Sequence, residues 1–211
     1  MNFVKNKLTV TGGMEDLLIF ISENYERVYP CENKDISDYI LFFDRLFPTP
    51  DDFLISREKT FEWRLKNWST PSPAQYEQVN TLKVLYKHDY DYTRYYLSNL
   101  NNKFNGYLFY RFFNELDFYS SNLSPDENEL TCEFETILCP PFKIIENWIR
   151  RYNGLTLKFK LDYYDPEVEF AGNIHFDYNK NLYELEHFSK ETDDEKYIEY
   201  LLKIGVDNYE R

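Results

Sequence analysis

The stretch from residue 130 to residue 177 constrains the fold most, because its hydrophobic residues change their spacing along the chain. They alternate over residues 130–136, follow a helical spacing over residues 144–152, and alternate again over residues 155–163 and 168–176. Alternation is typical of a strand with one buried face, and a period near 3.6 is typical of an amphipathic helix. The stretch therefore predicts strand, helix, strand and strand. Its inward-facing residues would be Leu130, Cys132, Phe134, Ile144, Ile145, Trp148, Ile149, Tyr152, Leu155, Leu157, Phe159, Leu161, Tyr163, Val168, Phe170, Ile174 and Phe176.

Turn and cap signals mark the ends of these elements. Pro140-Pro141 suits the first turn of a helix, because proline lacks only an N–H that would be unpaired there. Asn153-Gly154 supplies a left-handed cap after the helix, and Asp165-Pro166 supplies a turn between the last two strands. We expect residues 155–164 and 167–178 to form an antiparallel hairpin. The side chains expected on its helix side are Leu157, Phe159, Phe170 and Ile174, with Trp148 buried against them.

The first fifty residues show a similar order of elements. Apolar and polar residues alternate over residues 4–11, which predicts a strand with one buried face, and Gly12-Gly13 ends it. Met14, Leu17, Leu18, Ile21 and Tyr25 then follow helical spacing. The stretch from Tyr39 to Phe47 is apolar on both faces and ends at Pro48-Thr49-Pro50, so we expect a buried strand there.

Strand–helix–strand followed by strand–helix–strand–strand is the order of two split β-α-β units. We therefore predict an α+β fold, a ferredoxin-like antiparallel sheet with both helices on one face, built from residues 1–50 and 129–178. Residues 51–128 form an inserted, aromatic-rich subdomain, because structureless connections longer than about 15 residues are uncommon. Residues 179–211 form a C-terminal extension, in which residues 182–188 are a further strand. A short helix follows it, with the apolar stripe Tyr197, Ile198, Leu201 and Leu202.

Several short motifs of this chain occur in the same order in one known family. They are Asn6-Lys7-Leu8-Thr9-Val10-Thr11-Gly12, Phe134-Glu135-Thr136, Pro140-Pro141 and Phe170-Ala171-Gly172. With them the chain resembles the YubB-type ferredoxin-like proteins carried by phages and plasmids. A fainter likeness lies at Asn67-Trp68-Ser69-Thr70, where the family has Asn-Trp-Gly-Thr. That family is defined by its fold and genetic context, so the resemblance implies a mobile-element accessory protein that acts in the cytoplasm of a host cell.

Composition and charge argue against two classes of partner. The formal net charge is -13 and the pI about 4.7, which repels nucleic-acid phosphates. The outward positions of the predicted sheet carry mixed charge and no aromatic rings, so we expect no nucleic acid on the sheet face. These positions are Lys7, Thr9, Glu133, Glu135, Lys158, Lys160, Glu169 and Asn173. No apolar run is long enough to span a bilayer, so no membrane partner is expected.

Motifs that would carry catalysis are missing from the sequence. There is no GxGxxG, no GxxxxGK and no HExxH, and His88, His175 and His187 are scattered. The three cysteines show no CxxC spacing, as expected for reduced thiols in the cytoplasm. We therefore expect no enzyme activity, no cofactor and no metal site.

The sequence favours a non-enzymatic protein that binds and blocks a host protein, such as one of a defence system. The alternative is a small-ligand binder that sequesters a nucleotide signal, in which rings stack the base and arginines hold the phosphate. Less favoured readings are an enzyme and an acidic DNA mimic. The insertion is the candidate contact surface, because Tyr and Arg are enriched at interface hot spots, although its rings could equally form its own core. The candidate residues are Arg94, Tyr95, Tyr96, Tyr107, Tyr110, Arg111, Asn67 and Trp68.

Overall fold

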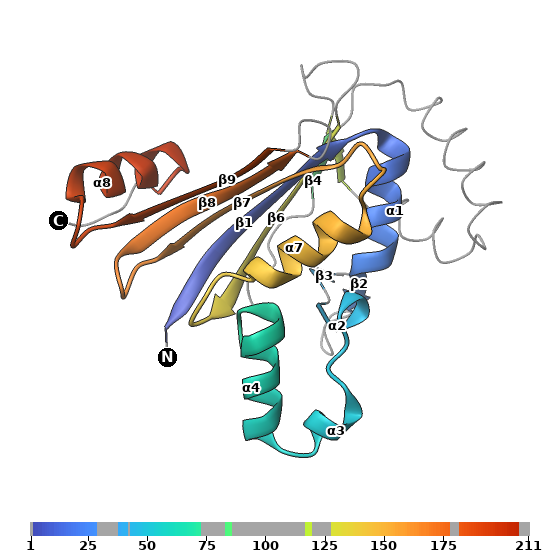
Figure 1. Ribbon diagram of the computed structural model, residues 1–211. Helices are drawn as coiled ribbons and strands as arrows, with labels where there is room; N and C mark the ends of the chain where they lie inside the picture. The colour runs from blue at the N-terminus through green and yellow to red at the C-terminus, as the bar shows by residue number, and fades with distance from the viewer. Residues whose placement is uncertain are drawn as a thin grey trace.

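Five antiparallel strands form the centre of the protein and make it an α+β fold (Figure 1). The computed structural model describes residues 2–28, 38–41, 43–72, 83–85, 117–119, 128–177 and 182–206. The five strands are, in their order across the sheet, β6 (Asn128–Ile137), β1 (Phe3–Gly12), β7 (Lys158–Asp165), β8 (Phe170–Asp177) and β9 (Leu182–Ser189). Two short strands, β4 (Lys83–Leu85) and β5 (Asp117–Tyr119), extend the sheet beyond β6. Four helices accompany it: α1 (Met14–Asn24), α4 (Arg57–Trp68), α7 (Phe142–Arg151) and α8 (Asp194–Lys203).

Strand β1 is the middle strand of the apolar core. It pairs antiparallel with β6 and with β7, so that Leu8 lies opposite Cys132 on one side and Leu161 on the other. All three side chains are fully buried. Because side chains alternate along a strand and directly paired residues share a face, this register gives the sheet one continuous apolar face.

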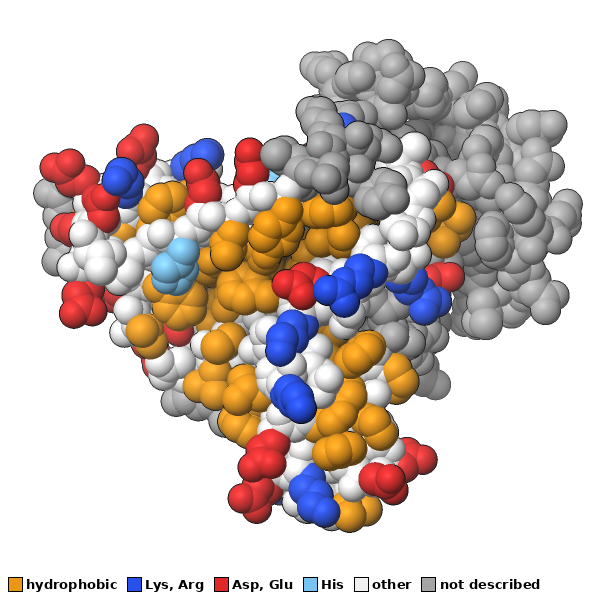
Figure 2. Space-filling model, in the orientation of Figure 1, with side chains coloured by type: hydrophobic (Ala, Val, Ile, Leu, Met, Phe, Trp, Pro, Cys, Tyr) orange, Lys and Arg blue, Asp and Glu red, His pale blue; other side chains and the backbone are white. Residues whose placement is uncertain are grey.

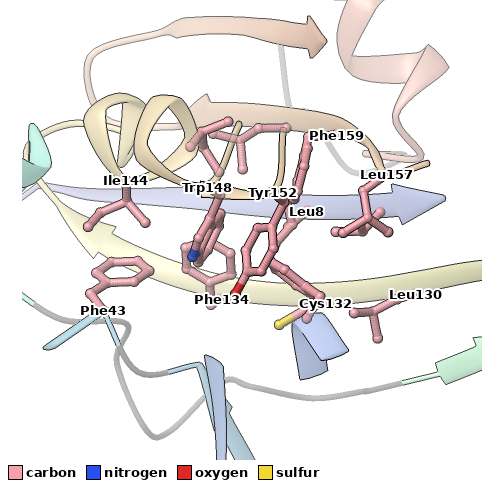
Figure 3. Close-up of a cluster of buried hydrophobic side chains, with 14 of the residues drawn as sticks. Leu8, Phe43, Leu130, Cys132, Phe134, Ile144, Trp148, Tyr152, Leu157 and Phe159 are labelled. Carbon is pink, nitrogen blue, oxygen red and sulfur yellow. The ribbon is translucent and has the colours of Figure 1, made fainter. Parts of the chain in front are cut away.

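Helices α1 and α7 lie side by side on that apolar face (Figure 1), and Figure 3 shows Ile144 and Trp148 of α7 among the buried side chains. The ring of Phe20 in α1 meets the rings of Trp148, Tyr152 and Phe159 edge-on, with centroids 5.3, 5.4 and 5.5 Å apart. Trp148 is 0% exposed, and its indole N–H donates to Oδ1 of Asn24 at 2.8 Å. The expected burial of Trp148 against the sheet is therefore confirmed.

The predicted hairpin is also confirmed. Strands β7 and β8 pair antiparallel, with Leu161 opposite Ile174. Leu157, Phe159 and Ile174 are buried, and Phe170 packs against the same core. The alternation read from the sequence thus gives the pairing and the face, except at Val168, which lies in the turn between the strands and is 54% exposed.

The C-terminal strand and helix occur where the sequence predicts them, but α8 lies on the other face of the sheet. The Tyr200 hydroxyl donates to Oδ1 of Asp162 and to the Gly172 carbonyl, both at 2.7 Å. Asp162 is adjacent to the inward-facing Leu161 and so points away from α1 and α7. The predicted stripe is wrong at Leu202, which is 59% exposed; Tyr200 is buried in its place.

The strand predicted over residues 39–47 is wrong in its second half. Strand β3 (Asp38–Leu41) ends early and pairs with β2 (Tyr25–Val28) in a separate two-stranded sheet. The short helix α2 (Phe43–Leu46) follows, and Phe43 is fully buried. Tyr25, assigned to the first helix by its spacing, begins β2 instead. An apolar run does not by itself distinguish a buried strand from a buried helix, which explains the error over residues 43–46.

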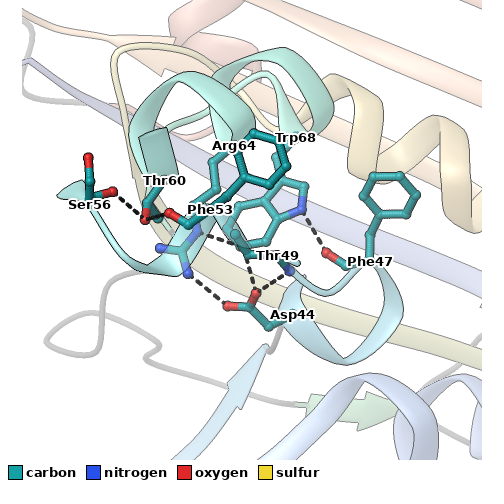
Figure 4. A network of polar contacts seen from close by, with 8 residues as sticks. All are labelled: Asp44, Phe47, Thr49, Phe53, Ser56, Thr60, Arg64 and Trp68. Atoms are coloured by element: carbon teal, nitrogen blue, oxygen red, sulfur yellow. Dashed lines mark hydrogen bonds and ion pairs between the residues drawn. The ribbon is translucent and has the colours of Figure 1, made fainter. Parts of the chain in front are cut away.

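Helix α4 follows the short helix α3 (Asp51–Leu54) and joins the core through Trp68. The fully buried Trp68 ring lies edge-on to Phe43, with centroids 5.9 Å apart, and its indole N–H donates to the Phe47 carbonyl at 3.0 Å. Arg64 lies over the Trp68 ring and pairs with Asp44 at 3.1 Å. Figure 4 shows this network, which fixes α4 to the segment that precedes it.

Candidate functional site

An apolar groove opens on the side of the sheet that carries α1 and α7. It lies between α4, the turn that precedes α7, and strands β7 to β9, and it has a volume of about 450 Å³. Figure 2 shows hydrophobic side chains gathered in a broad band on this side of the molecule. The residues that line the groove are Leu65, Ser69, Cys139, Pro140, Phe142, Tyr163, Phe170 and His187.

Tyr163 of β7 forms the aromatic centre of this groove. Its ring lies edge-on to Phe142 and Phe170, with centroids 5.2 and 6.1 Å apart, and stacks on His187 at 6.4 Å. The Tyr163 hydroxyl is 3.3 Å from Nδ1 of His187. Gly172 leaves room for this ring, because a Cβ at position 172 would collide with it. Burial raises the pKa of Tyr163 above its ordinary value, so its hydroxyl stays protonated as a hydrogen-bonding group.

The groove continues into exposed apolar side chains on β9. Tyr183 and Leu185 lie opposite Phe176 and Ile174 of β8, on the helix side of the sheet. They are nevertheless 49% and 53% exposed, whereas Ile174 is 1% exposed. In Figure 1, β9 lies beyond the layer that α1 and α7 form. A contiguous exposed apolar surface of this kind marks an interaction site more often than isolated exposed residues do.

Leu138 stands beside the groove in a strained backbone conformation. Its φ is 68°, in the left-handed region that favours glycine and asparagine, and its side chain is 40% exposed. The turn is held by the Leu138 N–H, which donates to the Asn2 carbonyl, and by the Thr136 hydroxyl, which donates to the Cys139 carbonyl. An exposed leucine in this conformation contributes little to folding. Strain of this kind clusters at functional sites.

Cys139 brings a thiol into the groove. Burial and the nearby Asp165 carboxylate raise the pKa of this thiol above its ordinary value. The thiolate, not the thiol, is the nucleophilic form, so Cys139 lacks the lowered pKa that covalent catalysis uses. The groove therefore offers apolar contact area instead of an activated nucleophile.

The groove also lacks the permanently charged side chains. None of the described residues that line it is Lys, Arg, Asp or Glu. A nucleotide site needs cationic or N–H donors for the phosphate oxygens, whereas an apolar protein segment needs contact area and shape. The groove therefore offers apolar contact area and no Lys or Arg for a phosphate among the described residues that line it.

The opposite face of the sheet has a different character. Lys5 lies opposite Glu135 and Lys7 lies opposite Glu133 across the β1–β6 pair. In β7, Nζ of Lys160 is 2.7 Å from Oδ2 of Asp162. Opposite charges that face one another across strands stabilise a sheet and neutralise each other's fields. Lys5, Lys7 and Lys160 of this face thus each lie near a carboxylate, in agreement with the mixed charge of the sequence.

Most of the site residues predicted from the sequence lie outside the residues that the structure describes. These are Arg94, Tyr95, Tyr96, Tyr107, Tyr110 and Arg111. Asn67 and Trp68 are described, and both have internal partners. The Asn67 amide donates to the Trp63 carbonyl at 2.8 Å, and Trp68 packs in the core. A contact of any of these eight residues with a partner stays a prediction.

Sequence reasoning did not find the groove, although it did assign several of its residues to the right elements. Phe142, Tyr163, Phe170 and His187 are distant in the sequence, and only the folded sheet brings them together. One signal was present: a further apolar strand at residues 182–188 adds a sheet face that two helices do not suffice to cover.

Comparisons with known proteins give no family or relative for this chain. No family model, no curated protein and no solved structure matches it. Among the described residues, no group of three or more His, Cys, Asp or Glu side chains is placed to hold a metal ion. The described helices include none with the length and apolar content to cross a membrane.

Proposed function

We propose that this chain is a non-enzymatic binding protein that blocks another protein by taking an apolar segment of it into the groove. The observation that carries this proposal is the exposed apolar surface formed by the groove and by Tyr183 and Leu185. Because Tyr183 and Leu185 are about half exposed, folding does not gain the full hydrophobic free energy of burying them. A partner that covers them would gain it on binding, at roughly 25 cal/mol for each Å² of apolar surface buried.

The strand order supports the finer fold assignment. Strand β4 is antiparallel to β6, which is antiparallel to β1, so β1 and β4 run in the same direction with β6 between them. Strands β6 and β7 likewise flank β1. We infer from the order β4-β6-β1-β7 two interleaved split β-α-β units, the ferredoxin-like arrangement, with β4 in the place expected for residues 39–47. It agrees with the resemblance to phage- and plasmid-borne proteins, from which we infer a protein of the host cell as the partner.

A nucleotide is the competing ligand. The stacked rings of Tyr163 and His187 would suit a base. The groove, however, supplies no cation for a phosphate from the described residues that line it. A lining without Lys or Arg therefore favours a protein segment over a nucleotide.

The test uses Leu65, which is 38% exposed on α4 and lines the groove. A tagged Leu65→Glu variant should retain the wild-type melting temperature, since glutamate is a good helix former. It should recover at least about tenfold less of the partner from host lysate, because hot-spot contacts are worth 2 kcal/mol or more.

The matched control is Leu202→Glu, which introduces the same charge at an exposed leucine on α8. It should leave the captured protein unchanged. Equal losses of captured protein in both variants would refute the proposed function. So would a nucleotide that, without any partner protein, raises the melting temperature of the wild type but not of Leu65→Glu.

A further inference from the structure

Strand β9 is the edge of the sheet, and its outer side has no partner among the described strands. Alternate residues of an edge strand present their N–H and C=O groups outward, where another strand can pair with them. Natural proteins commonly protect such an edge with proline, lysine, a bulge or a very short strand. Strand β9 has eight residues, pairs with β8 in an unbroken register, and contains neither proline nor lysine.

The two faces of β9 differ in chemistry. On the helix side, Tyr183, Leu185 and His187 continue the apolar groove. On the other side, Glu184 and Glu186 alternate with them. A strand added to this edge would therefore meet apolar side chains on one face and carboxylates on the other.

Among the described residues, the carboxylates of these two glutamates contact His175 and Asn173, whereas that of Asp162 pairs with Lys160. Oε2 of Glu184 is 3.9 Å from Nδ1 of His175, and Oε2 of Glu186 accepts from the neutral Asn173 amide at 2.7 Å. In the described part of the chain neither glutamate pairs with Lys or Arg. On β1 and β6, by contrast, Lys5 lies opposite Glu135. The sheet is thus charge-balanced at its centre and acidic at this edge.

Helix α8 leaves the acidic part of the edge accessible. It packs on the end of β9 that contains Phe188, whose ring centroid lies 5.0 Å from that of Tyr200. Glu184 and Glu186 lie nearer the N-terminal end of β9 and are both exposed. An incoming strand can therefore approach β9 without displacing α8.

A second copy of this chain is a poor occupant. A symmetric antiparallel pairing of two β9 strands places residue i opposite residue j and j opposite i. The two registers with the longest overlap place Glu184 opposite Glu186, or Glu186 opposite its own copy. Like charges directly opposite one another destabilise a strand pair. The charges of Glu184 and Glu186 therefore disfavour pairing between two copies of β9 and favour a strand that carries basic side chains.

We propose that β9 binds an extended segment of the partner protein by strand addition. The segment carries Lys or Arg at alternate positions, opposite Glu184 and Glu186, and apolar residues between them, beside Tyr183 and Leu185. Backbone hydrogen bonds supply part of the affinity, and the alternating side chains supply the specificity. This inference rests on the proposed function in taking the ligand to be a protein, and it names that ligand's conformation and charge.

The experiment titrates the full chain with two capped synthetic peptides, one alternating valine and lysine and one alternating valine and glutamate. Amide shifts and hydrogen exchange are followed by NMR. The lysine peptide should protect β9 amides and bind more weakly as salt rises. The double variant Glu184→Lys, Glu186→Lys should weaken the lysine peptide about tenfold and strengthen the glutamate peptide, because strand pairs discriminate between charges.

Two controls isolate the edge. Glu195→Lys with Glu199→Lys makes the same change of net charge at exposed positions on α8 and should leave both affinities within about twofold. Glu184→Gln with Glu186→Gln keeps an acceptor for Asn173 and should give an intermediate loss, even if the lysine double variant misfolds.

Several results would overturn the inference: no shift of β9 amides at about 1 mM lysine peptide, a peptide footprint elsewhere, or equal affinity in the charge-reversed variant. If these occur while Leu65→Glu still loses the captured protein, the groove function stands and the edge inference falls. If Leu65→Glu captures the partner normally and the lysine peptide binds β9, the edge inference stands and the proposed groove function falls.

Discussion

Leu138 combines a folding cost with an exposed apolar side chain, which suggests that it serves binding. Its left-handed φ of 68° costs a non-glycine residue roughly 1–2 kcal/mol, and asparagine tolerates this region better than leucine. We predict that Leu138→Asn raises the free energy of unfolding by up to about 1 kcal/mol. The same variant should bind the partner more weakly. Urea denaturation and partner capture measure the two effects.

Leu138→Ala is the control for this residue. Alanine keeps the cost of the left-handed conformation and removes the apolar side chain, so it should weaken binding without a gain in stability. If Leu138→Asn destabilises the protein or leaves binding unchanged, the strain at this turn has no connection with the groove.

At the scale of elements, helix α7 depends on Trp148 for its attachment to the sheet. Its ring is enclosed by Phe20 and Phe159, and its indole N–H is paired with Asn24. We predict that Trp148→Ala lowers the free energy of unfolding by about 3–5 kcal/mol, since it leaves a large cavity. Trp148→Phe should cost less but should still leave Oδ1 of Asn24 without that donor. A loss below about 1 kcal/mol for the alanine variant, measured by urea denaturation, would show that the apolar stripe of α7 is not core.

The elements that the sequence predicts correctly have a clear apolar period. Strand β1 alternates clearly in burial, and α7 has a proline start and a full apolar stripe. Strands β7 and β8 alternate in sequence, although α8 buries part of their second face. The prediction failed over residues 43–46, where an apolar run without a clear period does not distinguish a strand from a helix. It also failed at Leu202, because Tyr200 takes the buried position through hydrogen bonds to β7 and β8 that no local pattern encodes.

At the scale of the whole molecule, the sheet separates two apolar clusters. The larger one lies under α1 and α7, and the smaller one, with Ala171, Tyr197 and Leu201, lies under α8. Neither covers the helix-side face of β9, where Leu185 is exposed. The groove exists because the sheet is wider than its helix layer. Sequence patterns show that each strand has an apolar face, but they do not show which of those faces a helix will cover.

Two candidate binding surfaces can therefore be compared in the intact chain. One is the groove, and the other is the predicted insertion with Arg94, Tyr95 and Arg111. If the groove carries recognition, Leu65→Glu should abolish partner capture, and the triple variant Arg94→Ala, Tyr95→Ala, Arg111→Ala should retain it. The reason is that the groove supplies a preformed apolar surface from residues of the core and α4. Capture from host lysate and circular dichroism of each variant give binding and folding separately. Loss of binding in the folded triple variant, with Leu65→Glu unaffected, would move the site to the insertion. Loss in both would define one partner surface that extends from the groove to the insertion.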